Sequence, residues 1–280
     1  LRTEYRLNFQ WLFILFTVSA LTVTMPCHFL HLRQVYPLDL AINSVDDMYE
    51  GCEEKMYQKV EKDFLENEKN TNEIFRAAWN EAENYFNDKW KKPNNLNKLE
   101  LVAIAAYTHA KPAIPPVLNK AVREQGPEYK TTFKYHSLHF FLTSAIRKLH
   151  PENCYTAYRR TTVSFTQDVL NKNMRFGHFT SSSRFPLESR LSKKVFGEKS
   201  CFFIETCFGA DFSMYSKFGD AEAEILIPPY EVFKVTNVET RAKKKELPCE
   251  VVYTVKSTKK TLSNYNCALI RNSKNSHSLN

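Results

Sequence analysis

The sequence predicts an α+β fold, with helices in the N-terminal half and strands in the C-terminal half. Residues 45–148 carry apolar side chains at helical spacing, whereas short runs rich in β-branched and aromatic residues follow Pro151. Because the helices come first and the strands afterwards, without βαβ alternation, we expect a helical half packed on a β-rich half.

The helical half is divided by proline-containing breaks. A Lys-Pro-Asn-Asn sequence at 92–95 and three prolines within 112–116 interrupt the periodic pattern. The predicted helical segments contain residues 56–64, 74–85, 99–107, 118–123 and 138–149.

The strands of the second half are predicted from short runs of β-favouring residues between turn signals. They are expected at residues 155–158, 161–165, 174–182, 201–207, 223–227, 230–238, 251–255 and 266–270.

The two ends of the sequence indicate a secreted protein. Arg2 and Arg6 precede an apolar run from Trp11 to Val23, which is too short to span a bilayer comfortably. We therefore expect residues 1–26 to be a cleaved signal peptide. Residues 271–280 are polar and lack the apolar tail of a lipid-anchor signal, so no stable membrane anchor is expected.

Composition argues against several classes of binding site. The net charge is +8, but the densest basic run, at 241–245, has no interleaved aromatic residues, so we expect no nucleic-acid partner. The chain has only six glycines and contains neither a Rossmann fingerprint nor a phosphate loop. No Cys or His spacing is typical of a zinc site, and no metal is expected.

Seven cysteines in a secreted chain indicate disulfides. Cys27 lies at the predicted signal boundary, and the other six cysteines allow fifteen pairings. The number and positions of the cysteines alone do not determine which of these pairings form.

The most informative residues are Glu222 and Glu224, which stand two apart before a Pro-Pro pair. On a strand both carboxylates point to the same side, where crowding and shielding from water can support acid, base or cation-stabilising chemistry. The same spacing occurs at 66–68 and 81–83, but there the pattern predicts solvated helices on which such residues do not face each other.

Two other strand-like segments carry polar groups that could join this pair. Arg159 suits bidentate recognition of phosphate, although an exposed charge at a strand end is the alternative. The hydroxyls of residues 181–183 could fix an amide, a ribose or a carboxylate, or simply end a polar strand. His178 is interpreted as a histidine on a strand face rather than as a base.

Taken in order, these segments resemble the ecto-ADP-ribosyltransferases, the vertebrate surface and secreted mono-ADP-ribosyltransferases related to bacterial toxins. That family is marked by an Arg on a first strand, a Phe-x-Ser-Thr-Ser run and a Glu-x-Glu before an Ile-Pro-Pro segment. The matching segments are Tyr158-Arg159, residues 179–183, Glu222-Ala223-Glu224 and residues 226–229, supported by 121–124, 138–143 and 215–218. The resemblance covers roughly residues 36–270, which are expected to form a single ADP-ribosyltransferase domain with a central NAD cleft.

The resemblance implies an arginine-specific transferase, a glycosyltransferase that moves ADP-ribose from NAD+ to an exposed arginine of an acceptor protein and releases nicotinamide. Glu224 would stabilise the ribosyl cation, and Glu222 would orient and deprotonate the incoming guanidinium. Arg159 would hold the phosphates, and Ser181 would position Glu224 and the nicotinamide ribose. The loop from Tyr215 to Ala221 would meet the acceptor.

The resemblance also implies which residues bind NAD+ and which cysteines pair. The NAD-binding residues would be Arg159, Arg160, Ser181, Ser183 and Glu224. The implied disulfides are Cys52–Cys267 and Cys154–Cys207, and the family pattern leaves Cys201 and Cys249 open.

Two departures from the family pattern bear on activity. Arg160 stands where the family commonly has Gly, so its side chain must point away from the nicotinamide, and Ser182 replaces the middle Thr. The alternatives to the transferase are an NAD+ glycohydrolase, with water as acceptor, and a secreted recognition protein on a catalytically decayed scaffold.

Overall fold

The computed structural model describes residues 34–89, 95–108, 112–187, 196–215 and 223–270. Residues 1–26, Glu222, the acceptor loop from 216 to 221 and the polar tail at 271–280 lie outside these ranges. Among the described residues, no helix has the length and apolar character needed to span a membrane.

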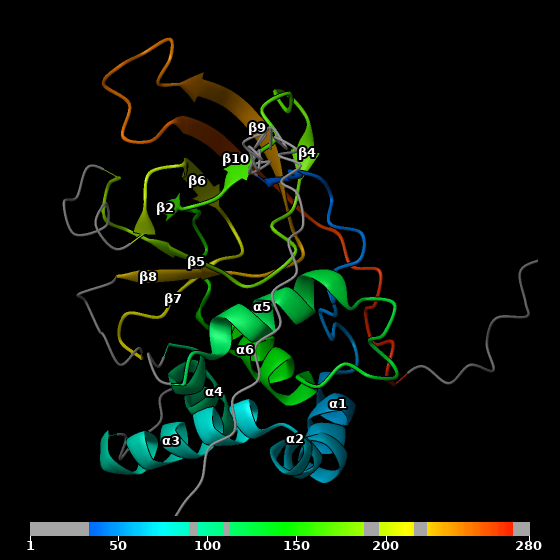
Figure 1. Ribbon diagram of the computed structural model, residues 1–280. Helices are drawn as coiled ribbons and strands as arrows, with labels where there is room; N and C mark the ends of the chain where they lie inside the picture. Colours follow the sequence, from blue (N-terminus) through cyan, green and yellow to red (C-terminus); the bar gives the residue numbers. More distant parts are fainter. Residues whose placement is uncertain (1–33, 90–94, 109–111, 188–195, 216–222, 271–280) are drawn as a thin grey trace, which may run out of the picture. The chain divides into compact units, whose positions relative to one another are not determined.

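The helices follow one another along the N-terminal half and gather in the lower part of Figure 1, below the sheet. They are α1 (Glu53–Lys59), the π-helical turn η1 (Val60–Phe64), α2 (Leu65–Thr71), α3 (Glu73–Lys89), α4 (Lys98–Thr108), α5 (Ile114–Glu124) and α6 (His136–Leu149). Helix α4 lies deepest, since every residue from Glu100 to Thr108 is buried. Residues 101–107 form an uninterrupted apolar run, which is typical of a central helix.

The strands form a large mixed sheet, together with a small parallel pair of β1 (Val35–Tyr36) and β3 (Ser164–Phe165). The order in the large sheet is β4-β9-β10-β6-β2-β5-β8-β7. Its strands are β2 (Tyr155–Thr161), β4 (Asn173–Met174), β5 (Thr180–Ser183), β6 (Ser200–Thr206), β7 (Ala210–Asp211), β8 (Glu224–Ile227), β9 (Glu231–Thr240) and β10 (Val251–Thr261). The α+β prediction is confirmed.

The large sheet is only weakly connected between β2 and β5, and we call this junction the seam. Strands β2 and β6 pair along seven positions, but β2 and β5 pair at a single position, Tyr158 with Ser183. The sheet thus has one part ending at β2 and another made of β5, β8 and β7. Side chains of the second part, including Phe179, Phe212 and Leu226, pack into the core that the helices form.

Glu68, from one of the Glu-x-Glu copies expected on a solvated helix, is buried instead. Its carboxylate accepts backbone N–H groups of His136 and Ser137, the first residues of α6. A carboxylate satisfies the open donors of a helix N-terminus and interacts favourably with the helix dipole. Burial nevertheless dominates and raises the pKa of Glu68 to about 7.

Two predicted strands differ from the structure. Residues 266–270 form a turn rather than a strand, because Cys267 adopts a left-handed φ of 59° and its N–H bonds to the Asp47 carboxylate. The predicted strand at 174–182 is interrupted at Gly177, where φ is 70°. Before this interruption Arg175 forms a fully buried ion pair with Asp46, at 2.7 Å.

Three disulfides hold distant segments together. The structure pairs Cys52 with Cys267 and Cys154 with Cys207, as the resemblance implied. The third bridge, Cys201–Cys249, fills the pairing that the sequence left open.

Candidate active site

Arg159, Ser181 and Glu224 come together where the two parts of the sheet meet. Arg159 lies on β2, and its Nη1 donates a hydrogen bond to the backbone carbonyl of Ser181 on β5. Burial lowers the pKa of Arg159, while interactions with Tyr107 and with the Glu224 carboxylate act in the opposite direction. The Arg159 guanidinium therefore stands in the electrostatic field of the Glu224 carboxylate, across the seam.

The pairing of β5 with β8 fixes how the serines face the glutamate. Ser183 pairs with Glu224, and Ser181 pairs with Leu226 two residues further on. Because alternate residues of a strand share a face, Ser181 and Ser183 lie on the same side as Glu224. Ser182 points the other way, and its hydroxyl donates to the Ile225 carbonyl at 2.8 Å.

Glu224 begins β8 in a constrained position. It is 6% exposed, and its carbonyl accepts the N–H of Phe212 at 2.9 Å. Ala223, immediately before it, has φ of 43°, a left-handed conformation that costs a non-glycine residue about 1 kcal/mol. Strain of this kind is often found at functional sites, and here it directs the chain into β8 at the carboxylate.

Tyr107 and Asn119 belong to the same cluster, and sequence reasoning missed both. The Tyr107 hydroxyl lies 3.3 Å from the Ser181 hydroxyl and donates to the Phe179 carbonyl at 3.1 Å. Asn119 in turn donates through Nδ2 to the Tyr107 hydroxyl at 3.0 Å. The sequence showed Tyr107 only as one more apolar residue of a buried helix.

The electrostatics of this cluster keep its tyrosine neutral. Burial and, after it, the Glu224 charge raise the pKa of Tyr107 to about 12. The hydroxyl is therefore a hydrogen-bond donor at neutral pH and can orient Ser181. The Oδ1 atom of Asn119 is buried without a hydrogen-bond partner among the described residues.

Arg160 follows Arg159 on β2 and points to the opposite face of the strand. Its side chain is 6% exposed and donates to three backbone carbonyls: Leu187 at 2.8 Å, Gly197 at 3.2 Å and Pro248 at 3.1 Å. The Arg160 guanidinium on β2 is therefore hydrogen-bonded to Leu187 and Gly197, which lie before and after residues 188–195. The side chain lies away from the Arg159 cluster, and only the Arg160 backbone could contact a ligand there.

His178 is held neutral beside the cluster. Burial, followed by the charges of Arg159 and Arg123, lowers the pKa of His178 to about 3. Its Nδ1 lies 2.8 Å from the Phe176 carbonyl, as expected of a structural histidine. Within the described ranges, no cluster of His, Cys, Asp and Glu side chains could hold a metal ion.

Comparisons with known proteins point to one family. The profile of the family described as NAD:arginine ADP-ribosyltransferase matches residues 38–257. The chain is 30% identical to the chicken NAD(P)(+)--arginine ADP-ribosyltransferase 1 over 84% of this chain and 73% of that protein. It is 34% identical to the mouse T-cell ecto-ADP-ribosyltransferase 1, over 83% and 77% respectively.

Solved structures agree with the sequence comparisons. The crystal structure of the eucaryotic mono-ADP-ribosyltransferase ART2.2 has a TM-score of 0.68 and 33% identity, covering 83% of this chain and 98% of that one. A mutant of ART2.2 in complex with NAD has a TM-score of 0.67 and 32% identity, with the same coverage.

Proposed function

Because this chain belongs to the NAD:arginine ADP-ribosyltransferase family, we propose that it transfers ADP-ribose from NAD+ to arginine side chains of proteins and releases nicotinamide. The observation that carries the proposal is the convergence of Arg159, Ser181 and a buried Glu224 at the seam of the sheet. NAD+ is thus a substrate.

Glu224 is proposed to promote cleavage of the bond between the ribosyl carbon and the nicotinamide nitrogen. The leaving base takes the bonding electron pair, and positive charge develops on the ribosyl carbon, as in glycoside hydrolysis. A carboxylate shielded from water interacts strongly with such a cation. Glu224 also lies on the strand face of Ser181 and Ser183, whose hydroxyls can orient the ribose.

Arg159 is proposed to bind the diphosphate. A guanidinium binds phosphate oxygens through paired N–H groups, and only Nη1 of Arg159 is engaged by the Ser181 carbonyl. Tyr107 supports this arrangement through Ser181, and the buried carbonyl of Asn119 offers an acceptor for an amide or a hydroxyl.

Glu222 is proposed to select the acceptor. Its carboxylate would orient an incoming guanidinium and accept its proton as a nitrogen of that group bonds to the ribosyl carbon. This role rests on the sequence spacing, since Glu222 lies outside the described residues. The acceptor is proposed to be a protein with an exposed arginine.

An extracellular site of action is proposed from the cysteines. Three disulfides connect the described residues, and such bridges persist in oxidising compartments. The related mouse and rat proteins are named ecto-enzymes. We propose that residues 1–26 direct secretion and that residues 36–270 act as a single catalytic domain.

The proposal is tested with labelled NAD+ and polyarginine as acceptor, beside polylysine. Wild type should label polyarginine only, and Glu224→Gln should reduce the rate about 1,000-fold because a preorganised charge is lost. Glu66→Gln is the matched control, since that side chain is 69% exposed on α2. It should leave the rate unchanged.

Each alternative activity has its own outcome in this experiment. Free ADP-ribose without labelled polymer would indicate an NAD+ glycohydrolase. Intact NAD+ would indicate a decayed scaffold. Glu222→Gln should abolish transfer to polyarginine while some hydrolysis persists, and undiminished transfer would contradict the role of Glu222.

A further inference from the structure

The Arg184 guanidinium and the Asp211 carboxylate form an ion pair, at 2.6 Å, near the start of β8. Arg184 directly follows β5, and Asp211 ends β7. These two strands are the neighbours of β8, one on each side. The ion pair therefore spans the strand that begins with Glu224.

The ion pair lies on the face of the sheet opposite the Glu224 carboxylate. Asp211 is paired with Ile225 in the antiparallel ladder, and residues paired in this way share a face. Ile225 directly follows Glu224, and successive residues of a strand point to opposite faces. The ion pair is thus directed away from the Arg159 cluster and can affect it only through the backbone of β8.

The backbone at the start of β8 is hydrogen-bonded on both sides. The Ala223 carbonyl accepts the N–H of Arg184 at 3.0 Å, and the Glu224 carbonyl accepts the N–H of Phe212 at 2.9 Å. One of these donors belongs to the ion pair, and the other directly follows Asp211. The ion pair thus connects the two donor segments next to Ala223, whose φ is 43°. It can oppose relaxation of Ala223 to the negative φ of an ordinary strand.

The Asp211 carboxylate is oriented for this contact. Its Oδ1 accepts the backbone N–H of Ser213 at 2.8 Å and also the Ser213 hydroxyl, while its Oδ2 accepts Nη1 of Arg184. Ser213 is buried, and Tyr215 beyond it packs into the core that the helices form. The Arg184 side chain is 54% exposed, so the pair contributes little to the stability of the whole domain. Its effect is local.

We propose that Arg184 and Asp211 are positioning residues, which hold the backbone of Ala223 and Glu224 in the conformation that the transfer reaction requires. Without the ion pair, Ala223 relaxes more often, and Glu224 then leaves its place beside Ser181. The catalytic part of this inference rests on the proposed function, whereas the restraint on the backbone does not.

Amide hydrogen exchange tests the restraint without any measurement of activity. The Arg184 N–H is followed in Asp211→Asn and the Phe212 N–H in Arg184→Gln, so that each amide belongs to an unaltered residue. Both should exchange about fivefold faster than in wild type, which is the upper value for an exposed ion pair. Unchanged exchange in both variants would overturn the proposal.

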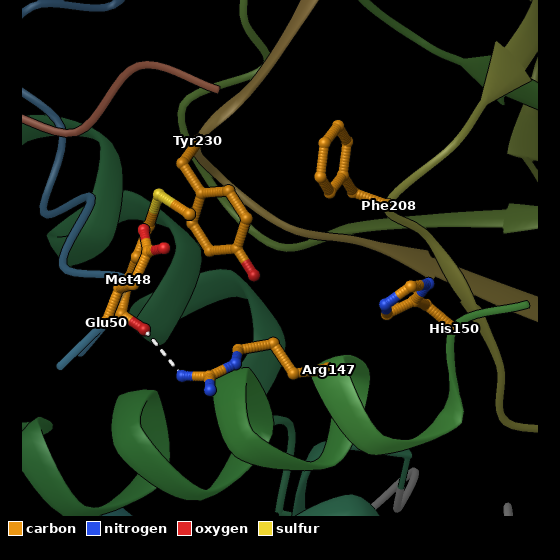
Figure 2. A pocket seen from close by; sticks show the side chains of 6 residues that line it. All are labelled: Met48, Glu50, Arg147, His150, Phe208 and Tyr230. Carbon is orange, nitrogen blue, oxygen red and sulfur yellow. Dashed lines mark hydrogen bonds between the residues drawn. The ribbon is translucent and has the colours of Figure 1, made fainter. Parts of the chain in front are cut away.

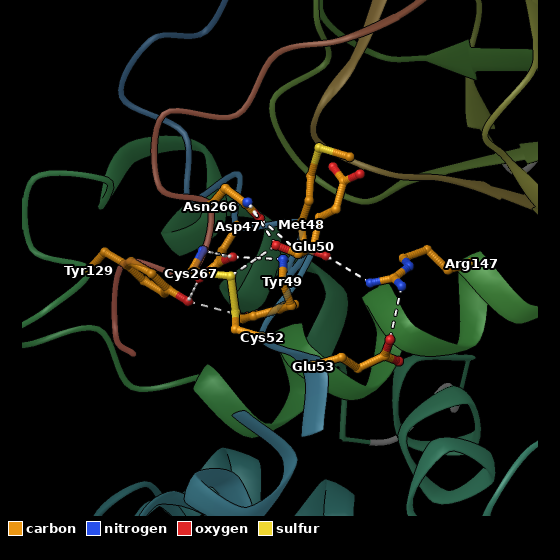
Figure 3. The surroundings of a disulfide bond; sticks show 10 residues. All are labelled: Asp47, Met48, Tyr49, Glu50, Cys52, Glu53, Tyr129, Arg147, Asn266 and Cys267. Atoms are coloured by element: carbon orange, nitrogen blue, oxygen red, sulfur yellow. Dashed lines mark hydrogen bonds and ion pairs between the residues drawn. A yellow bond between two sulfur atoms is a disulfide. The ribbon is translucent and has the colours of Figure 1, made fainter. Parts of the chain in front are cut away.

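A second ion pair provides the matched control. Arg147 on α6 donates to the Glu53 carboxylate at 2.9 Å, and the two side chains are 36% and 37% exposed (Figure 3). Arg147 and Tyr230 line the same hollow (Figure 2), and Tyr230 follows β8 at the end remote from Glu224. Glu53→Gln should leave both exchange rates unchanged. Equal acceleration in this control would overturn the proposal, because it would show a general loosening of the domain.

Kinetics with labelled NAD+ and polyarginine test the catalytic part. Asp211→Asn and Arg184→Gln should each lower kcat about fivefold and leave KM for NAD+ unchanged, because Arg159 is untouched. The double variant should be no slower than either single variant, since both changes remove the same contact. Adding Ala223→Gly to Asp211→Asn should restore the rate, because glycine adopts a positive φ without steric cost.

Three kinetic results would each overturn the role of the ion pair in the reaction: an unchanged kcat, an additive loss in the double variant, or no recovery with Ala223→Gly. A wild-type protein that leaves NAD+ intact would instead contradict the proposed function. The exchange rates would then still decide whether the ion pair restrains the start of β8.

Discussion

Replacing Arg160 by the glycine common in the family should destabilise this protein strongly. In Arg160→Gly the carbonyls of Leu187, Gly197 and Pro248 lose their donor in a buried place. A hydrogen bond to a charged group contributes about 1.5–3 kcal/mol, and water that enters the vacated space restores part of this. Glycine within a strand costs about 1 kcal/mol more.

The sum is a loss of about 4 kcal/mol, which is large for one substitution. For a domain of this size, such a loss lowers Tm by about 8–16 °C. Thermal unfolding followed by circular dichroism and calorimetry measures both quantities. Arg184→Gly is the matched control, since its guanidinium is 54% exposed and pairs with Asp211 at the surface. That variant should lose less than about 1 kcal/mol.

A Tm for Arg160→Gly within 2 °C of the wild-type value, on the order expected of an exposed site, would refute this account. It would mean that the three carbonyls are satisfied without the guanidinium. Greater transferase activity in the same variant would show that the Arg160 side chain obstructs NAD+, contrary to its position on the opposite face from Arg159.

Three further changes test other parts of the structure. Tyr107→Phe should lower kcat/KM about tenfold by removing the hydroxyl that is hydrogen-bonded to Ser181, with a smaller effect on the free energy of unfolding; unchanged kinetics would exclude that role. The pKa of Glu68 is raised because the folded state holds this proton more tightly than the unfolded state does. The free energy of unfolding of wild type should therefore fall by about 3 kcal/mol relative to that of Glu68→Gln as pH rises from 4.5 to 7. Urea unfolding measures this difference, and the opposite slope would show that the helix end stabilises the carboxylate more than burial disfavours it. Cys52→Ser with Cys267→Ser should lower the free energy of unfolding by about 5 kcal/mol in the chain-entropy model, since 215 residues separate the two; a loss under about 1 kcal/mol would contradict it.

Much of the fold could be predicted from local patterns. The helical half, the later strands and the position of Glu224 at the start of a strand follow from periodicity and from turn residues. The predicted strand at 266–270 was wrong because its apolar residues looked β-forming, whereas the buried Asp47 carboxylate accepts the Cys267 N–H and the buried Asp46 carboxylate accepts the Tyr265 N–H just before the segment. Those carboxylates lie more than 200 residues away in the sequence, beyond any local pattern.

The candidate site was predictable only in part for the same reason. Arg159, Ser181 and Glu224 stand in recognisable linear motifs, so their segments could be named from the sequence. Tyr107 and Asn119 are joined to them by hydrogen bonds between helices and strands, which leave no mark on local spacing. Arg160 could be recognised as a departure, but the carbonyls that bind it come from two connections that are distant in the sequence: Leu187 and Gly197 lie between β5 and β6, and Pro248 lies between β9 and β10.

The Cys52–Cys267 bridge imposes an order on how the protein is made. Cys52 leaves the ribosome 215 residues before its partner, which corresponds to about 10–40 s of synthesis. During that time Cys154, Cys201, Cys207 and Cys249 emerge and offer alternative thiols for exchange. Correct closure of the N-terminal segment must therefore wait until nearly the whole domain is translated. The yield of folded protein should depend on disulfide isomerase capacity more than on the rate of synthesis.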